Sequence, residues 1–157
     1  MQKITPFLWF DEQAEEAAQF YISIFKNSKI TTVTRYGEGG QKPEGTAMTV
    51  AFQLEGQEFV ALNGSPEFNF SPAISFYVNC ENQTEVDELW GKLTAGGEEE
   101  QCGWLKDKFG ISWQIIPSGL IEMLNSSDAE KSQRAMRAML QMVKIDLAKI
   151  KQAYDGS

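Results

Sequence analysis

The sequence contains no histidine, and this absence excludes more chemistry than any other feature of the composition. Zinc sites of the HExxH type, iron sites built from histidines and a carboxylate, and catalytic triads or dyads with an imidazole base all require this residue. Histidine is also the usual proton carrier near neutral pH. Any reaction that this protein performs therefore proceeds without an imidazole.

Long apolar runs are also missing. No segment approaches the roughly 18 consecutive apolar residues of a membrane span. The start, Met1-Gln2-Lys3, leads directly into a strand-like segment without the apolar core of a secretion signal, so we expect a cytoplasmic protein with no membrane contact. The formal charge of −8 opposes binding to nucleic acid, which requires a basic face.

Cysteine is scarce as well. Cys80 and Cys102 could form a disulfide, but free thiols are the more common state in a chain without a secretion signal. Cys102 could also act as a nucleophile, with Lys106 nearby to stabilise its thiolate. Because no imidazole is available to activate the thiol, a packing role is the favoured interpretation.

The first part of the chain predicts the order strand, helix and three strands. Residues 3–10 are rich in strand formers, and Asp11 follows as a candidate helix N-cap. Apolar residues then recur at helical spacing up to Phe25, so we expect this helix to end near Asn27. The three further strands are predicted at residues 29–36, 46–54 and 57–63.

The same order repeats from residue 73. Residues 73–79 predict a strand, in which Phe76-Tyr77-Val78 takes the place of Leu8-Trp9-Phe10 in the first pass. A helix is expected from about Thr84 to the stop signal at Gly96-Gly97. The remaining strands are predicted at residues 99–101, 103–106 and 111–116, with a turn at 107–110.

After Pro117 the pattern becomes helical. Ser127 to Glu130 matches a capping box, and Asp146 can cap a short final helix that ends at Gly156. The inner side of the first of these helices is predicted to carry Ala135, Met136, Met139, Leu140 and Val143. At this spacing the methionines favour core packing or a dimer contact over a ligand groove. We therefore predict an α+β fold and a single domain, residues 1–157, with one βαβββ module at 1–66, a second at 67–117 and a helical extension at 118–157.

Three segments carry a resemblance to a known family: Ile4 to Tyr21, Ala73 to Val78, and Gln101 to Ile115. They resemble the PhnB-like branch of the glyoxalase/bleomycin resistance/extradiol dioxygenase superfamily, also called the vicinal oxygen chelate superfamily. This resemblance implies two βαβββ modules whose eight strands curl around a shared cleft, and a homodimer. Related sequences are often labelled 3-demethylubiquinone-9 3-methyltransferase-like.

In enzymes of this superfamily a divalent metal is held at four positions on the first and last strands of each module. Carried over by the resemblance, these positions fall on Thr5, Ala61, Ala73 and Gln114. Only Gln114 offers a familiar ligand oxygen, and a single neutral amide does not hold a divalent ion against water. We therefore expect no metal and no other cofactor.

Strand alternation extends these four positions to a predicted ligand-binding cleft. Its lining is expected to be aromatic, with a few neutral hydrogen-bonding groups, which suits small, flat or amphipathic organic molecules. The alternative is a cleft filled by its own aromatic side chains. The predicted lining residues are Thr5, Phe7, Trp9, Phe59, Ala61, Asn63, Ala73, Ser75, Tyr77, Ser112 and Gln114.

Three functions are compatible with this interpretation. The first is a small-molecule binding protein without a metal, which holds its ligand through Trp9, Asn63, Tyr77 and Gln114. The second is a lyase, isomerase or transferase of the same superfamily, either metal-independent or with a metal held by carboxylates. The third is an interaction module that acts through the C-terminal helices. The methyltransferase label is not favoured, because the glycines from Gly37 to Gly40 lie between two strands with no helix after them.

Overall fold

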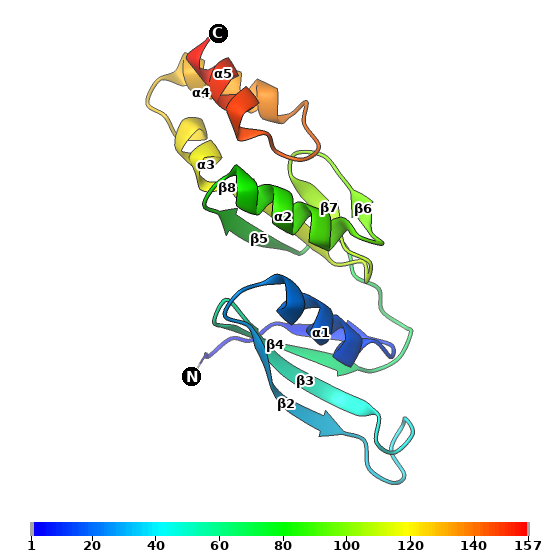
Figure 1. Ribbon diagram of the computed structural model, residues 1–157. Helices are drawn as coiled ribbons and strands as arrows, with labels where there is room; N and C mark the ends of the chain where they lie inside the picture. Colours follow the sequence, from blue (N-terminus) through cyan, green and yellow to red (C-terminus); the bar gives the residue numbers. More distant parts are fainter. Residues whose placement is uncertain (1, 157) are drawn as a thin grey trace. The chain divides into compact units, whose positions relative to one another are not determined.

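The computed structural model describes residues 2–156 and divides into two compact units, with the division between Asn69 and Phe70. Each unit contains one four-stranded sheet, with strand order β1-β4-β3-β2 in the first and β5-β8-β7-β6 in the second (Figure 1). Both units follow the order strand, helix and three strands, which confirms the predicted α+β class. Within residues 2–156, no helix is long and apolar enough to cross a membrane.

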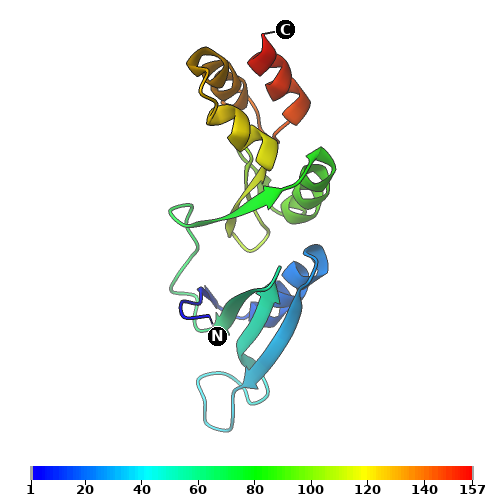
Figure 2. The same cartoon turned by 90° about the vertical axis from the view of Figure 1, so that its left-hand side faces the viewer.

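The first unit is built around a helix packed on one face of its sheet (Figure 2). β1 pairs with β4 in parallel, while β2 with β3 and β3 with β4 are antiparallel. Tyr21 of the helix stacks on Phe52, which stacks in turn on Phe59, with ring centroids 6.3 and 5.5 Å apart. The elements are β1 (Phe7–Phe10), α1 (Ala14–Ile24), β2 (Lys29–Arg35), β3 (Ala47–Leu54) and β4 (Gln57–Asn63).

β1 begins four residues later than the sequence pattern predicted. Pro6 has no N–H group to donate to a ladder, so the regular pairing starts after it. The carbonyl of Pro6 still accepts a hydrogen bond from the Val60 N–H at 3.0 Å. Residues 3–6 therefore lead into the strand without belonging to it.

The second unit repeats the same arrangement. β5 pairs with β8 in parallel, and α2 packs on this sheet with Val86, Leu89, Trp90 and Leu93 buried. The β7–β8 turn is held by the buried Asp107, whose carboxylate accepts hydrogen bonds from two backbone N–H groups of the turn and from the Trp113 indole. The elements are β5 (Ser75–Cys80), α2 (Gln83–Thr94), β6 (Glu98–Glu99), β7 (Trp104–Lys106) and β8 (Ser112–Pro117).

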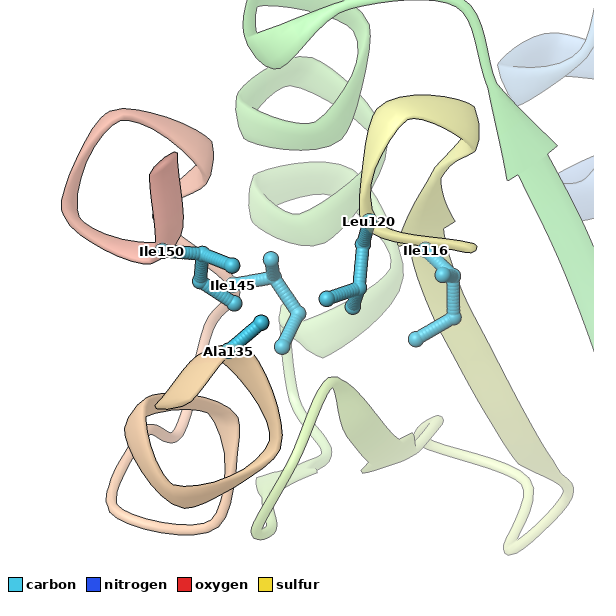
Figure 3. Close-up of a cluster of buried hydrophobic side chains, with 5 residues drawn as sticks. All are labelled: Ile116, Leu120, Ala135, Ile145 and Ile150. Atoms are coloured by element: carbon cyan, nitrogen blue, oxygen red, sulfur yellow. The ribbon is translucent and has the colours of Figure 1, made fainter. Parts of the chain in front are cut away.

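Three helices follow β8: α3 (Ser118–Leu124), α4 (Ala129–Met139) and α5 (Leu147–Asp155). The predicted cap of α5 is confirmed, because the Asp146 carboxylate accepts a hydrogen bond from the Lys149 N–H. The capping box predicted at Ser127 to Glu130 is wrong by one residue, because the cap of α4 is Asp128, whose carboxylate accepts from the Lys131 N–H. Gly156 closes α5 with φ +81°. These helices share a core with the end of β8, in which the side chains of Ile116, Leu120, Ala135, Ile145 and Ile150 converge (Figure 3).

The predicted inner side of α4 is wrong in part. Ala135 is fully buried, but Met136, Leu140 and Val143 are 41%, 52% and 37% exposed. α4 ends at Met139, so the helical spacing that linked Leu140 and Val143 to Ala135 does not continue past that point. Met136 directly follows Ala135 on the helix and lies on a neighbouring face.

We expect Leu120→Ala to lower the free energy of unfolding by on the order of 3 kcal/mol, because it leaves a cavity in the core shared by β8 and the C-terminal helices. Urea denaturation followed by circular dichroism measures this. Ile121→Ala on the same helix is the matched control, since Ile121 is 36% exposed, and it should cost under about 1 kcal/mol. Equal effects of the two substitutions would contradict the packing described here.

Candidate functional site

Each sheet has one face covered by its helix and one that we call the open face. On the first sheet the register pairs Phe7 with Val60 and Trp9 with Leu62. Partners in a ladder carry their side chains on the same face, and Leu8 and Phe10, which alternate with Phe7 and Trp9, are buried on the helix side. Phe7 and Trp9 therefore belong to the open face, as predicted.

The predicted orientation of β4 is wrong by one residue. Ala61 pairs with Leu8 and Asn63 pairs with Phe10, so both lie on the helix side, and so does Phe59. The two sides of β4 are equally apolar in sequence, so alternation alone does not distinguish them. The residues of β4 that share the open face with Trp9 are Val60 and Leu62.

Asn63 has a structural role in place of the predicted ligand contact. Its side-chain oxygen accepts a hydrogen bond from the Ala14 N–H at 2.9 Å, and its amide donates to the Ala47 carbonyl at 2.9 Å. Ala14 is the first residue of α1, and the cap residue Gln13 forms no side-chain capping bond. Asn63 thus satisfies the start of α1 from a distant strand, and the predicted cap at Asp11 is wrong.

The open face of the first sheet is partly covered by the chain that follows β4. The Trp9 indole donates to the Ser65 carbonyl at 2.8 Å and meets the Phe68 ring edge-on, with centroids 5.1 Å apart. A side chain at Gly64 would overlap the Trp9 ring, so this close approach requires glycine. The Trp9 N–H is therefore used within the protein.

A shallow hollow of about 190 Å³ lies beside Phe7 on this unit. Three of the predicted lining residues border this hollow: Thr5, Phe7 and Phe59. Phe59 belongs to the helix side of the sheet. The other residues that border it are Thr31, Ala51, Phe52, Glu58 and Val60. Thr5 lies just before β1.

The open face of the second sheet carries the remaining predicted residues. The register pairs Ser75 with Ser112 and Tyr77 with Gln114, which confirms that these four share a face. The Gln114 amide donates to the Ser75 hydroxyl at 2.9 Å. Tyr77 is 43% exposed. Partial burial, and to a lesser extent the electrostatic interaction with Cys80, raises the pKa of its phenol. The phenol is therefore neutral and can donate a hydrogen bond. Ala73 lies before β5 and is exposed.

Two residues of this open face were missed by strand alternation. Trp104 pairs with Gln114, and Lys106 pairs with Ser112, so β7 adds an aromatic ring and an ammonium group to the face. The turn at residues 107–110 fixes the register of this hairpin and could have revealed both. The open face of the second sheet therefore combines aromatic, hydroxyl, amide and cationic groups.

The two cysteines are free thiols. Cys80 is fully buried, and burial together with the negative charge of Glu85 raises its pKa to about 12. Cys102 is half-buried with a φ of +59°, and its backbone N–H donates to the Met142 carbonyl at 2.8 Å. Neither cysteine is one of the open-face residues.

Comparison with known proteins places this fold. The sequence profile of the 3-demethylubiquinone-9 3-methyltransferase family matches residues 2–116. The chain belongs to this family. A putative 3-demethylubiquinone-9 3-methyltransferase, the PhnB protein from Bacillus cereus, is 41% identical with a TM-score of 0.70, over 74% of this chain and all of that one. A search of curated proteins found no match.

A more distant solved structure shares the fold. Protein PA1353 from Pseudomonas aeruginosa is 17% identical with a TM-score of 0.63, over 74% of this chain and 98% of that one. The fosfomycin resistance protein FosX from Listeria monocytogenes is less similar, 14% identical with a TM-score of 0.49, over 72% of this chain and 89% of that one. The PhnB protein and PA1353, the two structures with TM-scores above 0.5, therefore show the fold of this chain.

The four positions that the resemblance assigns to a metal do not fit a divalent ion in this chain. The structural counterpart of Gln114 in the first unit is Leu62 and not Ala61, because Trp9 pairs with Leu62 as Tyr77 pairs with Gln114. The correction replaces one aliphatic side chain with another and adds no ligand atom. Within residues 2–156, no group of three or more histidine, cysteine, aspartate or glutamate side chains is arranged to hold a metal ion.

The adenosyl cofactor implied by the family's description does not fit either. Such a cofactor is commonly held where a glycine-rich turn leads from a strand into the N-terminus of a helix. Gly37 to Gly40 lie in an exposed loop between β2 and β3, and the next element is a strand. We therefore derive no methyl-transfer step for this chain.

We expect Asn63→Ala to lower the free energy of unfolding by roughly 2–4 kcal/mol, because it leaves a buried N–H and a buried carbonyl without partners. Chemical denaturation measures the effect. Asn69→Ala, at an exposed position of the same unit, is the control and should change stability by less than about 0.5 kcal/mol. A fully stable Asn63→Ala protein would refute the structural role.

We expect Cys80 to react with a thiol reagent such as DTNB at pH 8 on the order of a hundredfold more slowly than Cys102 in the folded protein, since its raised pKa and its burial both suppress the reactive thiolate. Cys80→Ala should leave the fast phase intact. Both thiols should react rapidly in urea. Fast labelling of Cys80 in the native state would contradict its placement.

Proposed function

We propose that the protein binds a small organic molecule, without a metal ion, through aromatic and neutral polar side chains on the open faces of its sheets. The observation that carries this proposal is the contrast between the two faces. The helix sides are filled by buried apolar residues, whereas Phe7 and Tyr77 are 60% and 43% exposed on the open faces. Exposed aromatic rings beside hydrogen-bonding groups are typical of sites for flat organic ligands.

The second sheet provides the better support for this role. On the first sheet, the Trp9 indole N–H is occupied by the Ser65 carbonyl. On the second, the Tyr77 hydroxyl and the Gln114 side chain lie next to each other in the ladder, so an aromatic surface and an amide are both available to one ligand. Of the four residues expected to hold the ligand, Tyr77 and Gln114 are retained on this face. Trp9 belongs to the first sheet, and Asn63 has a structural role there.

We also propose that the protein is a cytoplasmic homodimer. Large apolar side chains remain exposed in the monomer, among them Ile4, Phe7, Phe68 and Ile74, at 83%, 60%, 60% and 77%. We propose that these side chains lie in contacts between two copies of the chain, because contiguous exposed apolar surface marks such contacts. Native mass spectrometry at micromolar concentration should show a dimer, and a monomer alone would refute this part of the proposal.

To test the binding function, a library of flat, neutral and charged organic molecules is screened by thermal shift against the purified protein. For any molecule that raises Tm, we expect Tyr77→Ala to weaken binding about tenfold, because the substitution removes the aromatic ring on which the ligand stacks. Ile121→Ala, which removes an exposed apolar side chain elsewhere, should leave binding unchanged. Binding should also survive EDTA. Dependence on a stoichiometric divalent ion would refute the metal-free proposal.

A further inference from the structure

Four polar residues form a continuous row across the open face of the second sheet. The register pairs Ser75 with Ser112, Ser112 with Lys106, and Lys106 with Glu98. Because ladder partners share a face, the row runs from two hydroxyls to an ammonium group and ends at a carboxylate on the sheet edge. This row lies directly beside the one formed by Tyr77, Gln114 and Trp104.

Ser112 is the unusual member of the row. The residue is only 1% exposed, yet its side-chain oxygen has no hydrogen-bond partner. An unsatisfied buried hydroxyl destabilises a folded protein, so such a group requires an explanation such as a missing ligand. Its ladder neighbours Lys106 and Gln114 are partly exposed, so a ligand reaches the hydroxyl only when these side chains move aside.

The hydrogen-bonding groups of the row are mainly donors. The Ser75 oxygen accepts from the Gln114 amide at 2.9 Å, which leaves its own proton to donate. Ser112 has an unused hydroxyl, and the Lys106 ammonium can only donate. Donors that include a cation complement an anion, and bonds from a charged donor to an oxyanion are the stronger ones.

Glu98 limits the charge of the ligand that fits. It is the ladder partner of Lys106 on the side away from Ser112. Among the ion pairs of residues 2–156, none joins these two side chains. With one cation and one nearby carboxylate, the row favours a group of a single negative charge over a doubly charged phosphate. A carboxylate meets this requirement and can accept from several donors at once.

We propose that the open face of the second sheet is a carboxylate-binding subsite, in which Ser112 and Lys106, with Ser75 beside them, receive the acid group of the ligand while its flat apolar body lies against Tyr77 and Trp104. This inference rests on the proposed binding function and narrows it to aromatic or other flat carboxylic acids. The Tyr77 phenol, kept neutral by its raised pKa, does not repel such an acid.

The test compares matched pairs of an acid and its neutral amide, such as 2-naphthoate with 2-naphthamide and benzoate with benzamide, by isothermal titration calorimetry on the intact protein. We expect the acid to bind at least about tenfold more tightly than the amide. Lys106→Gln should abolish this preference, and Glu98→Gln should strengthen acid binding by a few fold, because a repelling charge is removed. Lys151→Gln, an exposed lysine on α5, is the control and should change nothing.

Ser112→Ala separates a ligand role from a structural one. We expect it to raise Tm by about 2–4 °C, since an unsatisfied buried hydroxyl is removed. The same substitution should weaken acid binding several fold and leave amide binding unchanged. A hydroxyl that serves only the fold would lower Tm when removed and leave the acid preference intact, which would overturn the proposal.

The outcomes distinguish this inference from the function on which it rests. Equal binding of acid and amide, with a Tyr77→Ala effect on both, would overturn the carboxylate subsite and leave the binding function in place. No binding by either member of any pair would overturn the carboxylate subsite, whereas the binding function as a whole is refuted only if no molecule in the thermal-shift library raises Tm. A preference for the acid that survives Lys106→Gln would overturn the assignment of the subsite to this row.

Discussion

The parallel pairing of the first and last strands of each unit is the constraint on which the rest of the structure depends. β1 and β4 run in the same direction, as do β5 and β8. The chain that connects the two strands of each pair must therefore return to the other end of the sheet before the second strand begins. α1 and α2 follow the first strand of their units and cover one face of each sheet. The register of these ladders then decides which side chains fill the core and which remain on the open face.

The sequence predicted the second unit better than the first, and residue types explain why. On β5 and β8, polar Ser75 and Gln114 alternate with apolar Phe76 and Trp113, so the two faces are distinct in the sequence itself. On β4 residues 59–62 are all apolar, so a shift by one residue has no visible signature. The order of elements, the cap at Asp146 and the β7–β8 turn depend on local patterns, and these were predicted correctly.

Asn63 shows what sequence reasoning could not reach. A polar residue at the end of an apolar strand suggested a ligand contact, whereas its two bonds go to Ala14 and Ala47, which are 49 and 16 residues away along the chain. No local pattern announces such partners. The unpartnered hydroxyl of Ser112 is equally invisible in the sequence, because its significance lies in an absent hydrogen bond at a buried position.

The residues after β8 lie beyond the part matched by the family, yet they are joined to the second unit through its backbone. Cys102 and Gly103 donate to the carbonyls of Met142 and Val143, and the Gln83 side chain bonds both the Ile145 carbonyl and the Leu147 N–H. During synthesis the first unit has all its strands once Asn63 is made and can fold at once. The second unit gains these bonds only when residues 142–147 have been made, so the segment between β6 and β7 and the start of α2 are held in place last.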